Sequence, residues 1–340
     1  MSEVRDTLQR LVRGEQLSRS DAHAVMCAVM AGDVDDASFG ALFATLHARG
    51  ETVEELAGLA SAMREHVVVA RAPIGSIDTC GTGGDGADTF NVSTCAALVA
   101  SGAGAVVAKH GNRAVSSSCG SADVLEALGG RLDATPEDVD RTFATARFAF
   151  LFAPAFHPSM RHAAGPRRAL GIRTAFNFLG PITNPAGVTR QVVGVSDAAM
   201  AARIADVLRE LGSEHALVVH GADGLDELSI ADSSVAYDVR PDGVTRFELD
   251  PESLGLVRAP IEAIRGGDAA RNAEILRAVL AGARGPSRDV VVLNAAAAIL
   301  VADLAGDLRE AAALAEQALD DGAALDQLER WIAATAEVAA

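Results

Sequence analysis

Between residues 77 and 249, short apolar runs alternate with longer segments of helical periodicity, and this alternation restricts the fold more than any other feature of the chain. The runs predict strands near residues 77–79, 105–108, 148–152, 192–195, 216–219, 235–239 and 244–249. The periodic segments predict helices at about residues 92–102, 121–128, 136–146, 198–211 and 268–282. Strands that are separated by helices usually lie parallel in one sheet, so an α/β domain with a mostly parallel central sheet is expected.

The N-terminal part of the chain shows helical patterns alone. Thr52 with Glu55 has the pattern of a capping box, and this part offers no convergent group of polar residues. We expect a small all-helical domain at residues 1–71, for packing or dimerisation, joined by a returning segment near residues 155–185. A larger α/β domain is expected at residues 72–340, and it ends in two or three Ala-rich helices.

A glycine-rich loop, GTGGDG at residues 81–86, follows the first expected strand. It satisfies the GxGxxG pattern, but AVVA at residues 105–108 stands where a dinucleotide-binding unit has an acidic residue, and the GK[ST] ending of a P-loop is absent. A glycine-rich turn that can approach a phosphate remains, followed by a helix with free N–H groups. Asn91 and Ser93 at this helix start can cap it, bind phosphate or coordinate a cation. Asp85 would repel a phosphate unless Mg²⁺ lies between them or the carboxylate binds sugar hydroxyls.

A second loop, KHGNRAVSSS at residues 109–118, leads from the second expected strand to a helix near Ser121. The chain has 29 lysine and arginine residues, and Lys109 is its only lysine. A compact ammonium group is not equivalent to a planar guanidinium, so we interpret Lys109 as functional. Loops at strand ends of α/β sheets carry ligand sites, and we therefore expect this loop to bind a ligand together with the glycine-rich loop.

Two further groups of polar residues lie farther along the chain. Neither histidine of HPSMRH, at residues 157–162, has the HExxH spacing of a zinc site. Arg167 and Arg168 can bind a substrate carboxylate through two parallel hydrogen bonds, although surface arginines are usually only solvated. Asp226 and Glu227 follow an apolar strand, and such a carboxylate pair on a glycine-rich loop suits Mg²⁺.

Composition excludes several classes of function. A net charge of −17 disfavours a protein that binds nucleic acid or anionic membranes through an exposed basic face. The four cysteines show no CxxC spacing, which is typical of reduced thiols in a cytosolic protein. The N-terminus carries charges where a signal peptide has an apolar core, so a cytoplasmic location is expected. The longest apolar run, near residues 290–302, is too short to span a bilayer.

Six segments in a fixed order resemble the anthranilate phosphoribosyltransferase family of tryptophan biosynthesis: GTGGDG, FNVST, KHGNRAVSS with GSADVLEALG, FLFAPAFHPSMRH, RRALGIRTAFNFLGPITNPA and VVHGADGLDELS. The resemblance spans roughly residues 8–302 and implies a helical N-terminal domain, a hinge, a larger α/β domain and a homodimer formed through the helical part. It also implies the reaction, in which the phosphoribosyl group of 5-phosphoribosyl 1-diphosphate (PRPP) is transferred to the amine of anthranilate, with release of diphosphate.

The resemblance further implies the residues of the site. PRPP would contact Gly81, Gly84, Asp85, Thr89, Asn91, Ser93, Thr94, Lys109, Asn112, Arg113, Ser117 and Ser121. Anthranilate would contact Gly81, His110, Asn112, His157 and Arg167. Two Mg²⁺ ions are implied, with Ser93, Asp226 and Glu227 as ligands. No side chain is expected to act as an acid or base, and Lys109 and Arg113 would act by position and charge.

Three residues depart from the usual family pattern, namely Cys80, Asp88 and Cys119. Gly165 and Pro166 precede the arginine pair, which leaves open whether Arg167 or Arg168 faces anthranilate. Two other functions remain possible at this point: a pyrimidine nucleoside phosphorylase, which has the same architecture, and a non-catalytic homologue that binds nucleic acid.

Overall fold

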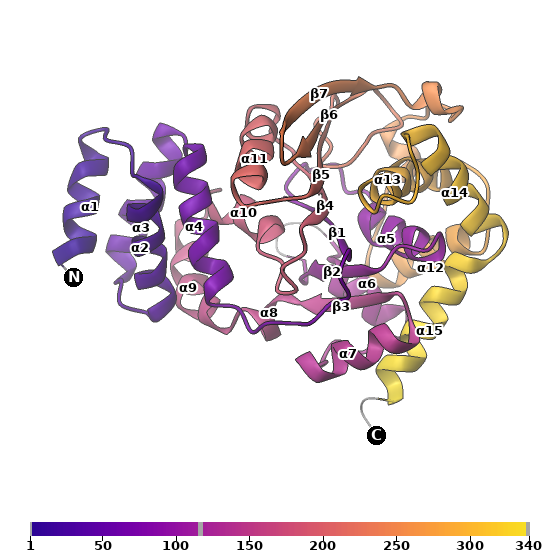
Figure 1. The fold of residues 1–340 in the computed structure, drawn as a ribbon, viewed down its shortest axis with the longest axis horizontal. Coiled ribbons are helices and arrows are strands. Elements are labelled where there is room, and N and C mark those ends of the chain that lie inside the picture. The colour runs from indigo at the N-terminus through magenta and orange to yellow at the C-terminus, as the bar shows by residue number, and fades with distance from the viewer. Residues whose placement is uncertain (1, 115–117, 338–340) are drawn as a thin grey trace.

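The computed structural model describes residues 2–114 and 118–337. Four helices form one end of the molecule (Figure 1), namely α1 (Ser2–Val12), α2 (Arg19–Ala31), α3 (Asp36–Arg49) and α4 (Val53–Glu65). The predicted capping box is confirmed, because Thr52 and Glu55 each accept a hydrogen bond from the other's backbone N–H. Glu55 is fully buried, where it also accepts from the N–H of Leu17 at 2.8 Å and pairs with Arg49. This one carboxylate therefore connects the starts of α2 and α4 to the end of α3.

Seven strands form one sheet in the order β3-β2-β1-β4-β5-β6-β7. The strands are β1 (Ile77–Gly81), β2 (Val107–Gly111), β3 (Phe148–Phe152), β4 (Arg190–Gly194), β5 (His215–Gly221), β6 (Ser234–Arg240) and β7 (Gly243–Leu249). The first five are parallel, whereas β6 and β7 form an antiparallel hairpin at one edge. All seven predicted strands are present, and the mostly parallel sheet is confirmed.

Two hydrophobic cores lie on opposite faces of this sheet, because alternate residues of a strand point to opposite sides. Val192 and Leu217 belong to the first core, and their neighbours Val193 and Val218 belong to the second. The helices of the first core are α5 (Val92–Gly102), α6 (Ser121–Ala127), α12 (Ala269–Leu280), α13 (Pro286–Val301), α14 (Leu308–Asp320) and α15 (Ala323–Glu337). Helix α7 (Pro136–Thr145) instead packs through Val139 in a third, smaller core with Ala149 and Leu151 of β3. Helix α13 is apolar nearly all round and is almost entirely buried, as expected of a central helix.

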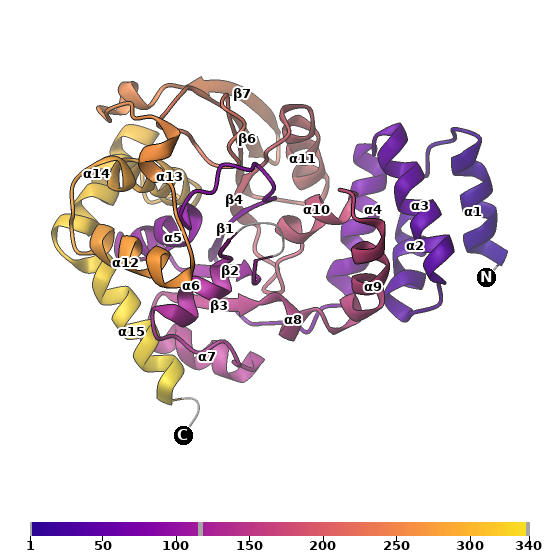
Figure 2. The same ribbon diagram turned by 180° about the vertical axis from the view of Figure 1, so that it is seen from behind.

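The second core is shared by α11 (Ala198–Glu210), the N-terminal helices and a returning segment. This segment consists of α8 (Ala153–Phe156), the short 3₁₀ turn Pro158–Met160, α9 (Arg161–Leu170), α10 (Phe176–Leu179) and a second 3₁₀ turn, Gly180–Ile182. Figure 2 shows α9 beside the N-terminal helices. The Phe176 ring stacks on Phe39 with 5.5 Å between ring centres, so the returning segment is fixed to α3.

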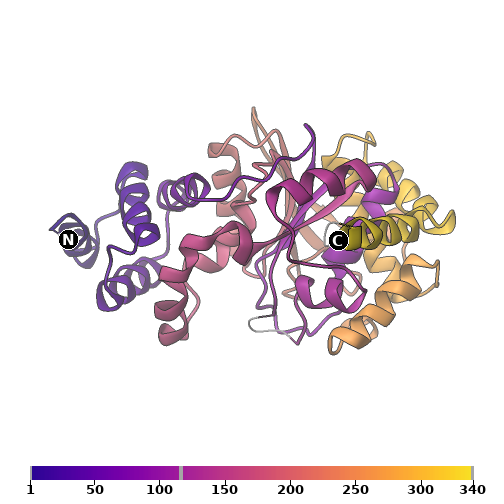
Figure 3. The same cartoon turned by 90° about the horizontal axis from the view of Figure 1, so that it is seen from below.

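The N-terminal helices and the C-terminal helices lie at opposite ends of the molecule, with the sheet between them (Figure 3). The small helical domain and the larger α/β domain of the predicted fold are thus both present. The boundary at residues 71 and 72 stays a prediction, because the second core continues from the helices into the sheet. None of the described helices is both long and apolar enough to cross a membrane.

Candidate active site

The strand order changes direction at β1, and this places the candidate site. From β1 the chain proceeds to β2 and β3 on one side, and β4 and β5 lie on the other. Ligands of open α/β sheets bind outside the carboxyl ends of the strands at such a switch point. The glycine-rich loop, the loop at 109–121 and the loop with Asp226 follow β1, β2 and β5, so all three leave the same edge of the sheet.

A pair of glycines at the ends of β1 and β4 makes room for the acidic loop. Gly81 and Gly194 are register partners, and a Cβ on either would overlap Asp226. Asp226 Oδ2 accepts a hydrogen bond from the N–H of Gly83 at 2.6 Å. Glu227 Oε1 accepts one from the N–H of Ser93 at 3.1 Å, at the start of α5. The structure therefore brings Asp226 to the glycine-rich loop and Glu227 to the start of α5, which are the two parts of the predicted phosphate site.

The electrostatics of this acidic cluster favour a cation. Burial, followed by the charge of Asp85, raises the pKa of Asp226 to about 7. Burial and the charge of Asp226 also raise the pKa of Glu227 well above its ordinary value. Three carboxyl groups and the hydroxyl of Ser93 offer only oxygen atoms, which are the ligands that Mg²⁺ prefers. These residues therefore fit a magnesium ion, whose charge would relieve their mutual repulsion.

The solitary lysine lies in a gap between β1 and β2. The two strands pair at Ile77 and Val107, and side chains bridge them beyond this point. Lys109 is 2% exposed, and its Nζ donates to the carbonyl of Thr79 and lies 3.4 Å from Ser93 Oγ. Burial lowers the pKa of Lys109, whereas the charge of Asp78 raises it. The ammonium group is thus a buried neighbour of Ser93, which is predicted to bind both metal and phosphate.

Asp78 and Asn184 complete this bridge, although the sequence analysis assigned no role to either. Asp78 accepts hydrogen bonds from the N–H of His110 at 3.1 Å and from Asn184 Nδ2 at 2.8 Å. Asn184 also donates to the carbonyl of Ala108 at 2.8 Å. Burial raises the pKa of Asp78 to about 6. A charged residue inside an apolar strand was the signal that could have identified Asp78.

His110 and His157 form a buried pair with 5.0 Å between their ring centres. Burial, followed by the neighbouring His157, lowers the pKa of His110 to about 3, and burial lowers that of His157 to about 4. Both rings are therefore neutral at pH 7. Within residues 2–114 and 118–337, neither Nε2 atom has a hydrogen-bond partner. The pair fits the predicted role beside a planar, aromatic substrate.

The two arginines on α9 differ in burial, and which of them faces anthranilate stays a prediction. The guanidinium of Arg167 is partly buried and lies 5.0 Å from the centre of the Phe176 ring, whereas Arg168 is exposed. A third arginine, which the sequence analysis missed, touches the glycine-rich loop. Arg173 donates to the carbonyls of Gly83 at 3.1 Å and Gly84 at 3.2 Å. A Cβ on Gly84 would overlap the Arg173 guanidinium, and the φ of 77° at Gly84 favours glycine there.

The loop after β2 is held at both ends. Ser121 Oγ donates to the carbonyl of Asn112 at 3.3 Å, and Arg113 forms ion pairs with Asp123 and Glu126 of α6. The predicted ligand Ser117 lies outside the described residues. In its present position the Arg113 side chain is exposed and engaged by two carboxylates, so its role in binding PRPP stays a prediction.

The predicted residues in the loop after β1 point to different neighbours. Thr89 forms a β-bridge with Arg265, and Asp88 has a φ of 50°, a conformation that Asn and Asp tolerate better than most residues. The side chain of Asn91 is hydrogen-bonded to other parts of the protein, whereas the buried hydroxyl of Thr94 has no partner in the part of the chain that the structure describes.

Comparison with known proteins identifies the family. A model described as "Glycosyl transferase family, a/b domain" matches residues 74–325, and one described as the helical bundle domain of that family matches residues 5–67. A protein of Thermomicrobium roseum named anthranilate phosphoribosyltransferase is 52% identical over 332 residues, which cover 96% of this chain and 95% of the relative. The chain belongs to the anthranilate phosphoribosyltransferase family.

Solved structures of anthranilate phosphoribosyltransferases have the same fold. The enzyme of Thermus thermophilus superposes with a TM-score of 0.93 at 44% identity, covering 97% of this chain and 99% of that one. The Saccharomyces cerevisiae enzyme in complex with PRPP and Mg superposes with a TM-score of 0.91 at 28% identity, covering 99% and 98%. The resemblance read from the six segments is confirmed, and neither a nucleoside phosphorylase nor a nucleic-acid-binding homologue is favoured.

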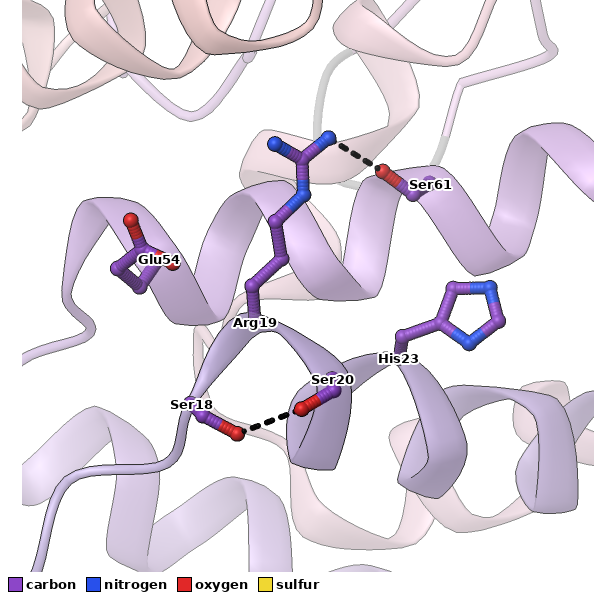
Figure 4. Close-up of a pocket in the computed structure, with 6 residues that line it drawn as sticks. All are labelled: Ser18, Arg19, Ser20, His23, Glu54 and Ser61. Carbon is purple, nitrogen blue, oxygen red and sulfur yellow. Dashed lines mark hydrogen bonds between the residues drawn. The ribbon is translucent and has the colours of Figure 1, made fainter.

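A surface pocket on the helical domain lies apart from the residues expected in an anthranilate phosphoribosyltransferase site. Figure 4 shows its lining residues, namely Ser18, Arg19, Ser20, His23, Glu54 and Ser61. Arg19 donates to Ser61 Oγ at 3.2 Å, and the hydroxyls of Ser18 and Ser20 are 2.9 Å apart. Beside it, His23 is paired with Glu65 at 2.9 Å, close to Cys27. None of the predicted site residues that the structure describes lines this pocket, so it is not the candidate active site.

Proposed function

We propose that this protein transfers the phosphoribosyl group of PRPP to the amine of anthranilate, giving N-(5-phosphoribosyl)anthranilate and diphosphate. One observation carries the proposal: the glycine-rich loop, the start of α5 and the carboxylates Asp226 and Glu227 meet at the switch point of the sheet. The Thermomicrobium roseum anthranilate phosphoribosyltransferase is 52% identical over 96% of this chain, which supports the same reaction.

The donor site would use backbone and side-chain groups of two loops. The diphosphate and ribose would lie against Gly81, Gly84, Asp85, Thr89 and the start of α5, where Ser93 and Thr94 add hydroxyls. Negative charge develops on the diphosphate as it leaves ribose C1, and the N–H groups at the helix start that Glu227 and Phe90 do not engage would stabilise that charge. Lys109 would add a positive charge from behind Ser93, in a site from which burial excludes water.

Magnesium would be held by Ser93, Asp226 and Glu227, and we propose two ions. The ions supply positive charge to the leaving diphosphate. The all-oxygen donor set and the raised pKa values of the two carboxyl groups support a cation here. The structure of the yeast relative contains PRPP and Mg. Calorimetric titration of Mg²⁺ in the presence of diphosphate would count the ions, and a single site would contradict the number proposed.

The acceptor site would place anthranilate between the glycine-rich loop and the returning segment. Arg167 would bind the carboxylate, while His110, His157, Asn112 and Gly81 would line the ring. The aromatic amine is nucleophilic in its neutral form, so no general base is required. Positioning of the amine opposite the leaving diphosphate would supply much of the rate enhancement. A yeast relative of 27% identity has been solved with 4-fluoroanthranilate, which supports an acceptor of this class.

We further propose a homodimer through the helical domain and a cytoplasmic location. Val12 on α1 is 70% exposed, and together with Leu8 it lines a shallow hollow whose other residues are Arg5, Gln9 and Arg13. The family resemblance is the main support for the dimer, and Val12 with Leu8 supplies apolar surface that a second copy would cover.

The reaction is tested by mixing the protein with Mg²⁺, PRPP and anthranilate and following anthranilate fluorescence. Fluorescence is expected to fall with time, and omission of PRPP or chelation of Mg²⁺ should stop the change. No change with all three components present, together with phosphorolysis of thymidine, would instead indicate a nucleoside phosphorylase.

A further inference from the structure

We infer that Asn272 is a positioning residue for the donor site. It lies in the first turn of α12, is 1% exposed, and belongs to none of the segments that identified the family. Its side chain holds Asn91 and, through Asn91, the end of the loop that follows β2. The inference rests on the proposed function, because it assumes that these loops bind PRPP.

Three hydrogen bonds connect segments that are remote in the sequence. The N–H of Gly267 donates to Asn272 Oδ1 at 2.8 Å. Asn272 Nδ2 donates to Asn91 Oδ1 at 2.9 Å, and Asn91 Nδ2 donates to the carbonyl of Cys119 at 3.0 Å. The two amides thus form a chain from the segment before α12, across the loop after β1, to the loop after β2. We call this chain the amide relay.

The direction of the amide relay is determined at both ends. The backbone N–H of Gly267 can only donate, and the backbone carbonyl of Cys119 can only accept. Each amide must therefore turn its oxygen toward Gly267 and its nitrogen toward Cys119. If either amide were flipped, two donors or two acceptors would face each other. A carboxylate at position 272 can still accept from Gly267, but it has no donor for Asn91.

The backbone around Asn272 also supports the loop after β1. The N–H of Phe90 donates to the carbonyl of Ile264 at 3.1 Å, and the N–H of Gly266 donates to the carbonyl of Asp88 at 2.8 Å. A Cβ on Gly266 would lie 2.6 Å from Asn272 Oδ1 and 2.8 Å from the backbone of Phe90. The segment therefore fits closely against this loop, and the side chain of Asn272 extends the support to Cys119.

The amide relay explains what the Asn91 side chain does. Its oxygen and its nitrogen each hold another part of the protein, so the Asn91 side chain also acts on the donor site through the position of the loops. Cys119 directly precedes the start of α6, where the hydroxyl of Ser121 donates to the carbonyl of Asn112. Movement of Cys119 would displace both of these proposed PRPP ligands. Loss of Asn272 should therefore weaken the donor site in particular.

The amide relay is tested with Asn272→Asp, which keeps the size of the side chain and the bond to Gly267. The KM for PRPP should rise by about tenfold, the size expected when a buried hydrogen-bonding group loses its partner. The value of kcat and the KM for anthranilate should change less. Asn91→Ala should raise the KM for PRPP as well, and adding Asn272→Ala to Asn91→Ala should cause no further rise.

A matched control is Gln327→Ala. Gln327 is a buried amide of α15 whose Oε1 accepts from the N–H of Arg147 at 3.0 Å, so its loss should lower the melting temperature and leave the KM for PRPP unchanged. Hydrogen exchange without substrates gives a second readout. Peptides covering residues 88–95 and 119–128 should exchange faster in Asn272→Asp than in the wild type, and at the wild-type rate in the control.

The inference is overturned if Asn272→Asp keeps the wild-type KM for PRPP and the wild-type exchange in both peptides. It is also overturned if the Gln327 variant raises this KM equally, since the effect would then reflect general destabilisation. A wild-type protein that does not consume anthranilate would contradict the proposed function instead. Exchange in the two peptides would still decide the amide relay, because that measurement uses no substrate.

Discussion

Lys109 shows how burial changes the interpretation of a single residue. The sequence pattern predicted a compact ammonium group on a loop, but the residue lies in β2 and is 2% exposed. Its ammonium group bridges the separated strands β1 and β2 and stands behind Ser93. In such a buried position a compact ammonium group is not equivalent to a planar guanidinium, which agrees with the use of lysine at this one position.

Lys109→Ala should lower kcat/KM for PRPP by at least tenfold, because a hydrogen bond to a charged group contributes about 1.5–3 kcal/mol. Lys109→Met is the control for volume, since it keeps an unbranched side chain and removes the charge together with its hydrogen-bond donors. Steady-state kinetics would be measured with each variant below its melting temperature. Wild-type kinetics in a folded Lys109→Met protein would exclude a role for the charge.

Arg167→Ala should raise the KM for anthranilate by about tenfold and the KM for PRPP less, because the lost guanidinium would bind the acceptor's carboxylate. The neighbouring Arg168→Ala is the matched control, since Arg168 is exposed and should leave both values unchanged. Steady-state kinetics with anthranilate and PRPP varied in turn would give the two KM values separately. If only the Arg168 variant affected anthranilate, the assignment would be shifted by one residue.

His157 gives a prediction about stability and pH. Its folded pKa of about 4 lies below the ordinary value near 6.5, so the unfolded state binds the proton first. The contribution of neutral His157 to the free energy of unfolding is complete above pH 6.5, and it is lost as the pH falls toward 4. Buried carboxyl groups with raised pKa values, such as Asp78 and Asp226, act in the opposite direction. To isolate the effect of His157, the pH dependence of the unfolding free energy must therefore be compared between the wild type and His157→Gln.

Relative to the wild type, His157→Gln should gain about 1.4 kcal/mol of unfolding free energy per pH unit as pH falls from 6.5 to 4. Urea unfolding at several pH values would measure this difference. Between pH 7.5 and 9 the difference should be constant, which serves as the internal control. If the unfolding free energies of the two proteins changed in parallel between pH 6.5 and 4, His157 would not be held neutral in the folded state.

At the scale of elements, the ends of β1 and β4 shape the site through residues that lack side chains. Gly81 and Gly194 lie side by side, and Asp226 fills the space above both. The carboxylate loop after β5 therefore reaches across β4 to the glycine-rich loop after β1. Strands without this pair of glycines would hold Asp226 away from Gly83, even with every predicted ligand present.

Gly194→Ala should raise the Mg²⁺ concentration for half-maximal activity by about tenfold or more, since misplacement of a reacting group by about 1 Å can cost about 100-fold in rate. The new Cβ would overlap the backbone carbonyl of Asp226. Gly243→Ala, at the start of β7, is the control, because no atom lies within 4 Å of its added Cβ. An unchanged Mg²⁺ titration for Gly194→Ala would contradict the proposed metal site.

At the scale of the whole molecule, the second hydrophobic core joins the helical domain to one face of the sheet. The returning segment carries Arg167 on α9 and Arg173 just beyond it. Arg173 donates to the glycine-rich loop, so the returning segment, which packs against the helical domain, touches the proposed donor site directly. Any movement of the helical domain would therefore be transmitted to Gly83 and Gly84.

The proposed homodimer is a prediction at this scale. Sedimentation equilibrium should give twice the mass of one chain, and Val12→Glu should shift the mass toward that of one chain, because a charge would be buried in the interface. Val257→Glu is the matched control, since Val257 is 71% exposed, compared with 70% for Val12, and lies outside the helical domain. A monomeric wild type, or dissociation by both variants, would contradict the proposed interface.

The sequence by itself determined the secondary structure, the mostly parallel sheet and the residues that follow each strand. Periodicity and capping are local properties, and Thr52, Glu55 and the seven strands lie where these properties predict them. The order of the six segments also determined the family. The position of the candidate site followed as well, because parallel strands bring their loops to one edge of the sheet.

Only the tertiary structure decided which side chains support that site. Asp78 and Asn184 bridge two separated strands, Gly194 leaves space for Asp226, and Asn272 reaches Asn91 from a helix 181 residues farther along the chain. Apart from the charge of Asp78 inside a strand, no local pattern marks these residues, because each acts on a partner that is close only after the strands have been ordered. Burial likewise separated Arg167 from Arg168, since exposure depends on the packing of the returning segment against α3.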